Sequence, residues 1–282
     1  MFKWYWYIGL ALLIIANLNF IFVIQPFAEW YIPIVWFGYI LFVDGLVYRL
    51  QGKSLISSNT KEFVFIAIIS VPFWLLFEVY NLFTNNWIYT NYVWYVHIAD
   101  FTTIMPAVLE TFMLVMALQI FGKVRLNFPT FFKGGHRKIT RKHVYMAAAP
   151  LIILGIIAVL LPIFAPQIGF PFVWIGLFLL LDPLNYALGR DSIVIWCSMG
   201  KGNRMLQLFL SGIIMGFFWE LWNYLAYPKW IYNIPSAVPL LKLFEMPLIG
   251  YLGYLPFALD VFLFYELSRS IISKSRNPVI AS

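Results

Sequence analysis

Long apolar runs alternate with short polar segments along the whole chain. Each run is continuous over about 20 residues, the length that a helix needs to cross a membrane. The first run lacks a small-residue cleavage site, so we expect it to remain as a span. The pattern predicts an all-α fold, a polytopic bundle of about eight membrane helices. The predicted spans are 4–24, 30–50, 62–82, 98–122, 144–165, 170–190, 205–226 and 247–270.

The composition is typical of a membrane protein and offers no cofactor motif. Of the 282 residues, 62% are hydrophobic and 11% are charged, and the mean hydropathy is +0.83. A soluble domain carries about a quarter charged residues. The single cysteine, Cys197, cannot form an internal disulfide, and three histidines are too few for the clusters of membrane di-iron enzymes. Glycine-rich nucleotide motifs and aspartate-rich diphosphate motifs are absent from the sequence. We therefore expect neither a cofactor nor a metal site.

The basic residues gather in every second connection between spans. All of the 19 Lys and Arg except Lys229 and Lys242 fall on one side of the predicted spans. By the positive-inside rule that side is the cytoplasm, so we expect an inner-membrane protein with both termini cytoplasmic. The densest basic stretch, 123–143, is predicted to be a cytoplasmic loop that could rest on anionic lipid headgroups. Nucleic acid is not an expected partner.

The two halves of the chain share a spaced set of residues, which indicates an internal duplication. The offset between matched positions rises slowly along the chain, as small insertions would make it do. We expect four-span repeats at 1–122 and 144–272, joined by the basic loop 123–143 and followed by a cytoplasmic tail, 273–282. Because four is even, the repeats should run parallel, related by an axis along the membrane normal. The matched pairs are Trp36 with Trp174, Asp44 with Asp182, Tyr48 with Tyr186, Glu78 with Glu220, Asn81 with Asn223, Trp87 with Trp230, Tyr89 with Tyr232, Pro106 with Pro256 and Glu110 with Asp260.

Three of the matched pairs are carboxyl groups inside predicted spans. An ionisable group near the bilayer centre costs about 2.5–3.5 kcal/mol, and no Lys or Arg lies mid-span to pair with them. Each carboxyl should therefore be protonated, hydrogen-bonded or facing a polar cavity. A carboxylic acid that burial keeps neutral can donate a proton to a substrate. The three pairs are Asp44 with Asp182, Glu78 with Glu220, and Glu110 with Asp260.

The neighbours of the glutamates favour a binding pocket. Asn81 and Asn223 follow Glu78 and Glu220 by three residues, so each pair shares a helix face and the amide could orient the carboxyl. Aromatic side chains near the acids could stabilise a cationic intermediate or guest. The candidates for substrate binding are the two asparagines and four aromatic residues, Asn81, Asn223, Trp74, Phe77, Trp219 and Trp222.

The later pair of acids has a proline four residues before each member. Pro106 precedes Glu110, and Pro256 precedes Asp260, so we expect a kinked helix beside each acid.

Other residues have a simpler interpretation. Asp100 is expected at a membrane interface, and the tryptophans and tyrosines after the span ends are expected in the interfacial aromatic belt. Asp44 and Asp182 lie towards the basic side, where they could be structural or form part of a proton relay. Any of the acids could also serve only to join helices. The expected belt residues are Trp87, Tyr89, Trp230 and Tyr232.

This order of acids, aromatic segment and proline resembles the lycopene-cyclase domain of integral-membrane lycopene cyclases and of fused fungal cyclases. Related membrane terpene cyclases are similar too. The resemblance covers about 30–122 and 170–270 and implies small helical domains that place acids around an apolar pocket without a cofactor. It touches the two span glutamates and the two acids after proline. The family carries two adjacent acids close to the proline, whereas here one acid stands four residues after it.

The favoured expectation is an enzyme, a cofactor-independent cyclase or isomerase of a polyprenoid or carotenoid-like lipid. Glu220 or Glu78 would protonate a double bond, and Glu110 or Asp260 would accept the proton that the cation loses. A proton-coupled transporter or flippase of a small or lipidic solute is the first alternative. A non-catalytic membrane subunit is the second. The expected partners are membrane lipids and an apolar prenyl-type substrate, and the sequence leaves the oligomeric state open.

Overall fold

The computed structural model describes residues 1–124, 141–234, 241–272 and 280, with 141–147 and Ser198 described by their backbone alone. Most of the predicted basic loop and of the predicted tail lies outside the described residues. The long helices are α1 (Trp4–Phe22), α2 (Tyr31–Gln51), α4 (Thr60–Thr84), α5 (Trp94–Ala117), α6 (Arg141–Phe164), α7 (Pro166–Ala187), α9 (Asn203–Leu225) and α10 (Tyr254–Ile272). The short elements are α3 (Leu55–Ser58), α8 (Ile193–Ser198), β1 (Trp87–Thr90), β2 (Lys229–Tyr232), β3 (Lys242–Leu243), β4 (Met246–Pro247) and a 3-10 helix, η1 (Leu248–Gly253).

The predicted all-α membrane bundle is confirmed. Within the described residues, seven helices are long and apolar enough to cross a membrane. The described apolar part of α6, Ala148–Phe164, is shorter, so the eighth span stays a prediction. In α1 only 17% of the apolar window is buried inside the bundle. An apolar helix surface of this extent requires lipid rather than water around it.

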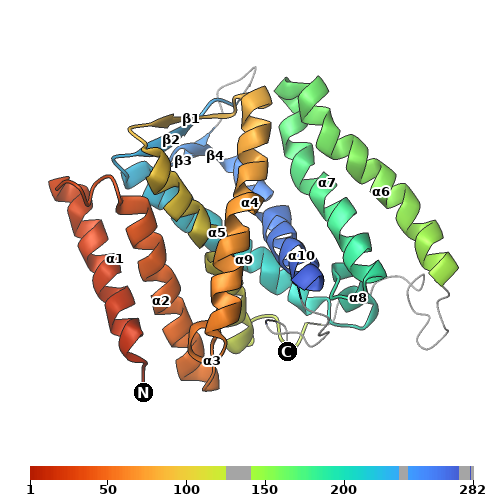
Figure 1. Ribbon diagram of the computed structural model, residues 1–282, viewed down its shortest axis with the longest axis horizontal. Helices are drawn as coiled ribbons and strands as arrows, with labels where there is room; N and C mark the ends of the chain where they lie inside the picture. The colour runs from red at the N-terminus through yellow and green to blue at the C-terminus, as the bar shows by residue number, and fades with distance from the viewer. Residues whose placement is uncertain (125–140, 235–240, 273–279, 281–282) are drawn as a thin grey trace.

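The helices pack side by side in one bundle, and the two halves of the chain lie next to each other in it. Helices α1 and α2 lie at one side, α6 and α7 lie at the other, and α4, α5, α9 and α10 lie between them (Figure 1). Strands β1–β4 lie at one end of the helices, which we call the strand end (Figure 1). Helices α3 and α8 and the start of α1 lie at the opposite end, which we call the termini end.

Each half contains the same order of elements. Two long helices are followed by a short helix, a long helix, a strand and a last long helix, and in the second half β3, β4 and η1 are inserted before that last helix. The pairs that pack together also correspond: α1 with α2 and α6 with α7, α2 with α5 and α7 with α10, α4 with α5 and α9 with α10. The halves meet chiefly where α5 packs on α9.

Strands β1 and β2 join the halves at the strand end. They pair antiparallel, with Trp87 opposite Tyr232 and Tyr89 opposite Trp230. We call the β1–β2 pair the ribbon. Each of its tryptophans lies opposite the tyrosine of the other half, as a two-fold axis through the middle of the ribbon would require.

The start of the last helix differs from the prediction. Residues 248–253 form η1, and α10 begins at Tyr254 rather than near 247. Pro256 thus lies in the first turn of α10, where the missing N–H of proline has no helical partner to lose. The expected kink before Asp260 is wrong, whereas Pro106 does lie inside α5.

Glycines let η1 and the start of α10 pack directly on α9. A Cβ added at Gly212 would overlap the carbonyl oxygen of Tyr254, and one added at Gly216 would overlap the ring of the same tyrosine. At Gly253 an added Cβ would meet no atom closer than 4.0 Å.

Replacing Gly212 by Ala should therefore lower the free energy of unfolding by about 1–3 kcal/mol, the usual cost of overpacking. The clash is with backbone, which cannot turn away as a flexible side chain can. Denaturant unfolding of the purified protein in detergent would measure the change. Gly253→Ala is the matched control and should unfold as the original chain does; equal loss in both variants would contradict the close approach of α9 and α10.

Candidate functional site

Two buried or half-buried glutamates each accept two side-chain hydrogen bonds near the strand end. Oε1 of Glu78 accepts from the indole of Trp74 at 2.8 Å and from the hydroxyl of Tyr89 at 2.5 Å. Oε1 of Glu220 accepts from the hydroxyl of Tyr232 at 2.7 Å and from that of Tyr254 at 2.5 Å. Each carboxyl is thus stabilised by hydrogen bonds from neutral donors rather than by a neighbouring Lys or Arg.

The second donor differs between the halves for a local reason. In the first half Trp74 stands one helical turn before Glu78 and reaches it along α4. The position four residues before Glu220 is Gly216, which has no side chain to donate. The space above this glycine is filled by the ring of Tyr254, which supplies the missing bond from across the interface.

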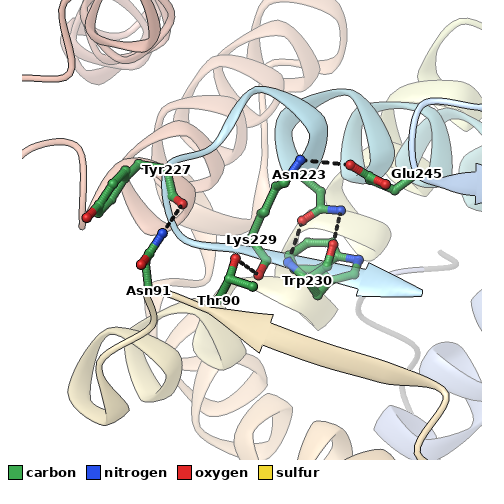
Figure 2. Close-up of polar contacts among 7 residues, drawn as sticks. All are labelled: Thr90, Asn91, Asn223, Tyr227, Lys229, Trp230 and Glu245. Atoms are coloured by element: carbon green, nitrogen blue, oxygen red, sulfur yellow. Dashed lines mark hydrogen bonds and ion pairs between the residues drawn. The ribbon is translucent and has the colours of Figure 1, made fainter. Parts of the chain in front are cut away.

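The asparagines do not orient the carboxyls, contrary to the prediction. The amide of Asn81 bonds both the N–H and the carbonyl of Trp87, at 3.1 and 2.9 Å. Asn223 makes the same two bonds to Trp230, both at 2.9 Å, as Figure 2 shows. Each asparagine therefore anchors a strand to its helix and fixes the position of the tyrosine two residues further along.

Further polar contacts tie the ribbon together (Figure 2). The hydroxyl of Thr90 donates to the carbonyl of Lys229 at 3.1 Å. The ammonium of Lys229 pairs with Glu245, between β3 and β4, at 2.7 Å. Asn91 donates to the carbonyl of Tyr227 at 3.4 Å.

An aromatic cavity of about 540 Å³ lies below this ribbon, between the halves. Helices α4, α5, α7, α9 and α10, strands β1 and β2 and η1 contribute to its wall. We call it the aromatic cavity, because rings make up much of the wall. These rings belong to Trp74, Trp87, Tyr89, Phe101, Phe170, Trp174, Trp219, Trp230, Tyr232, Tyr254 and Phe257.

Of the four aromatic residues predicted to bind substrate, two line the aromatic cavity. Trp74 and Trp219 do so. Phe77 is fully buried and stacks on Trp174 with ring centroids 4.3 Å apart, and Trp222 packs edge-on against Trp36 at 4.6 Å. Phe77 therefore supports the wall from behind through Trp174, whereas Trp222 packs against rings that do not line the cavity.

The four residues expected in the interfacial belt also line the aromatic cavity, so that expectation is wrong. Trp87 and Trp230 are buried, at 7% and 5% exposed. Burial raises the pKa of Tyr89 and of Tyr232 well above the ordinary tyrosine value, and the neighbouring glutamate raises it further. Both hydroxyls are therefore neutral donors over the physiological pH range.

Asp100 is the functional candidate that the sequence analysis missed. Its side chain lines the aromatic cavity, is 4% exposed, and its Oδ1 has no hydrogen-bond partner among the described residues. The predicted span began at 98, which placed this carboxyl at the interface. Because α5 begins at Trp94 instead, Asp100 lies in its second turn, inside the protein.

The second predicted acid pair lies elsewhere. Glu110 and Asp260 are 0% exposed, and their carboxyl oxygens have no hydrogen-bond partner within the described parts of the chain. Neither lines the aromatic cavity. Glu110 interacts electrostatically with Asp44. Glu78 and Glu220 do not line the aromatic cavity either, so the structure does not gather the four predicted catalytic acids around one space.

Asp44 and Asp182 hold the short helices at the termini end. Asp44 accepts from the N–H of Ile56 in α3 at 2.8 Å, and also from the hydroxyls of Ser54 and Tyr5. Asp182 accepts from the first N–H of α8, that of Ile193, at 2.5 Å. A carboxylate at a helix N-terminus satisfies N–H groups that have no partner within the helix. Of the two roles left open for this pair, the geometry favours the structural one.

The rim of the aromatic cavity between α7 and η1 is exposed and, apart from Gln167, apolar. Ile168 is 68% exposed, Ile249 is 69% exposed and Leu252 is 61% exposed. In a membrane such side chains face lipid, so the cavity can be reached from the side of the bundle.

Comparison of this chain with protein-family models, with curated proteins and with solved structures found no match. Within the described residues, no group of three or more His, Cys, Asp or Glu side chains could hold a metal ion.

Removing an asparagine anchor should loosen the ribbon. In Asn223→Ala two hydrogen bonds are lost, about 2 kcal/mol, which corresponds to about thirtyfold more frequent local opening. Hydrogen exchange with mass spectrometry would detect faster exchange of the amides in 229–232 and in the paired 87–90. Asn17→Ala is the control, since Asn17 bonds only the carbonyl of Leu13 in its own helix. Unchanged ribbon exchange in Asn223→Ala would contradict the anchoring role.

Proposed function

We propose that this chain is a membrane enzyme, a cofactor-independent cyclase or isomerase of a prenyl-type lipid of the polyprenoid or carotenoid class. One observation carries the proposal: the unpartnered carboxyl of Asp100 on the wall of an aromatic cavity. An acid in such a site stays neutral and donates its proton to a guest that offers electrons. A carbon–carbon double bond of a prenyl chain is such a guest.

The proposed reaction begins with transfer of the Asp100 proton to a double bond, which leaves a carbocation on the substrate. A neighbouring double bond attacks the cation and closes a ring. The faces of Trp74 and Trp219 stabilise the positive charge. The aromatic wall keeps water away from it.

Loss of a proton from carbon then ends the reaction. The hydroxyls of Tyr232 and Tyr254 line the aromatic cavity and are bonded to Glu220. A tyrosine oxygen takes the proton while its own hydrogen passes to Oε1 of the Glu220 carboxylate, the oxygen to which both hydroxyls are bonded. One proton enters the substrate and one leaves it, so the product has the mass of the substrate. The acid comes from the first half of the chain and the base from the second.

The cavity suits a lipid better than a water-soluble substrate. About 540 Å³ lies in the ordinary range for small-molecule sites. Apart from Gln167, its exposed rim residues are apolar, so a prenyl chain can enter from the membrane without crossing water. The charge distribution supports an inner-membrane protein with the strand end, which carries Lys229 and Lys242, outside and the termini end in the cytoplasm.

Two features favour the enzyme over the proton-coupled carrier. The aromatic cavity lies at the strand end, whereas a carrier must open towards both faces of the membrane. The glycines that could have acted as hinges, Gly212 and Gly216, are packed against Tyr254. A subunit with purely structural acids would not leave the carboxyl of Asp100 without a partner.

Asp100→Asn should lower product formation by about a hundredfold or more, since a positioned general acid contributes at least that factor. The chain and the variant would be produced in lycopene-producing bacteria and in bacteria that accumulate shorter prenyl chains. Lipid extracts would be compared by chromatography and mass spectrometry. Glu29→Gln is the control, because it removes a carboxyl between α1 and α2 that does not line the aromatic cavity.

A new product of unchanged mass that disappears with Asp100→Asn supports the proposal. A product heavier by one water would mean that water captures the cation and that the enzyme is a hydratase. Equal yield from Asp100→Asn would contradict the assigned donor, and extracts without any new product in both hosts would contradict the enzyme.

A further inference from the structure

A second cavity of about 520 Å³ lies beside the aromatic cavity at the strand end. We call it the side cavity. It opens to the surface, because two of its wall residues, Trp94 and Ile98, are 77% and 40% exposed. Its polar groups are those of Glu78, Tyr89, Asn91, Tyr92 and His97.

The two cavities share a wall. Tyr89 and Phe101 line both of them. The hydroxyl of Tyr89 is bonded to Glu78, which lines the side cavity, while Asp100 lines the aromatic cavity. We call this shared wall the partition. It consists of the rings of Tyr89 and Phe101, and the hydroxyl of Tyr89 is a polar group within it.

Unpartnered polar atoms lie near this partition. The hydroxyl of Tyr92 and Oδ1 of Asp100 are both buried without a hydrogen-bond partner in the described residues. Tyr92 interacts electrostatically with Asp100, Tyr89 and Glu78, and burial raises its pKa well above the ordinary value. The ring of His97 packs on Tyr92 and Tyr89, with centroids 4.0 and 4.3 Å away. Buried polar atoms of this kind in a roomy site are commonly bridged by water.

The second half lacks this arrangement. At the offset that relates Pro106 to Pro256, the position of His97 is taken by Pro247 and that of Asp100 by Gly250. Glu220 is 0% exposed and shielded by Tyr254. Of the two matched glutamates, Glu78 lines the side cavity, whereas Glu220 lines neither the side cavity nor the aromatic cavity.

We propose that the side cavity is a proton entrance that recharges Asp100 from water at the strand end, through Glu78 and the tyrosines of the partition. This deepens the proposed function and rests on it, since it supplies the proton that Asp100 gives to the substrate. A hydronium ion from the water of the side cavity gives its proton to the Glu78 carboxylate and remains as water. Glu78 then donates to the oxygen of Tyr89, whose own hydrogen passes by way of Tyr92 or a bridging water to the Asp100 carboxylate. One proton moves and each intermediate group ends as it began.

The test follows the carboxyl proton itself and does not need a substrate. Infrared spectroscopy of the protein in bilayers, switched from H₂O to D₂O, reports exchange of a protonated carboxyl as a shift of its carbonyl band. The band of Asp100 is identified by its loss in Asp100→Asn. We expect Tyr89→Phe and Glu78→Gln to slow its exchange about a hundredfold, the scale on which a positioned proton carrier acts. The matched variants in the second half, Tyr232→Phe and Glu220→Gln, should leave the exchange of Asp100 unchanged.

A second arm leaves the partition intact. Because Cys197 is the single cysteine, Cys197→Ser gives a background without thiols. Ile98→Cys in this background should react with a membrane-impermeant maleimide, and the adduct should slow exchange of Asp100 as the partition variants do. No labelling of Ile98→Cys, or normal exchange after full labelling, would overturn the entrance.

The outcomes separate the two proposals. Slowed exchange together with lipid extracts that contain no product would support the proton route and overturn the proposed enzyme. Product that depends on Asp100, together with exchange that Tyr89→Phe and Glu78→Gln leave unchanged, would overturn the route and leave the enzyme. Equal slowing of Asp100 exchange by the variants of both halves would also overturn the route. It would mean that exchange does not depend specifically on Glu78 and Tyr89.

Discussion

The site depends on one constraint: carboxyl groups inside an apolar bundle need donors, and no Lys or Arg among the described residues lines the aromatic cavity. The β1–β2 ribbon supplies one of the two donors of each glutamate, Tyr89 for Glu78 and Tyr232 for Glu220. Asn81 and Asn223 each bond the N–H and the carbonyl of one strand residue, which fixes where the following tyrosine points. A backbone segment with satisfied polar groups can then lie at the mouth of an apolar cavity at little cost.

The two halves use this scaffold differently, and the difference comes from few positions. Trp74 beside Glu78 is matched by Gly216 beside Glu220, and the glycine lets Tyr254 seal the second glutamate inside the protein. Asp100 in the first half is matched by Gly250 in the second. As a result one half carries an unpartnered acid with a route to the surface, and the other carries a closed glutamate held by two tyrosines.

The sequence predicts the helices well because their length and apolar character are set locally. It also singles out Glu78 and Glu220, because matched acids are rare in so apolar a chain, and each of them accepts a hydrogen bond from a tyrosine of the ribbon. It does not predict the ribbon. Four residues rich in tryptophan and tyrosine have the same composition as an interfacial belt, and their pairing depends on a strand about 140 residues away. Asp100 was missed for a smaller reason: a helix start misplaced by four residues moves a carboxyl from the interior to the interface.

Because Glu110 and Asp260 are buried away from the aromatic cavity, other residues must act as the base of the proposed reaction. A base that removes a proton from a carbocation must touch the substrate, and these two acids do not line the aromatic cavity. The tyrosines on Glu220 do line it, and they face it from the half opposite Asp100. Acid and base then act on different parts of one bound chain, so the proton lost at the base is not the one that Asp100 needs back. An enzyme built this way requires a separate proton supply for its acid, and the first half is where the described cavities provide one.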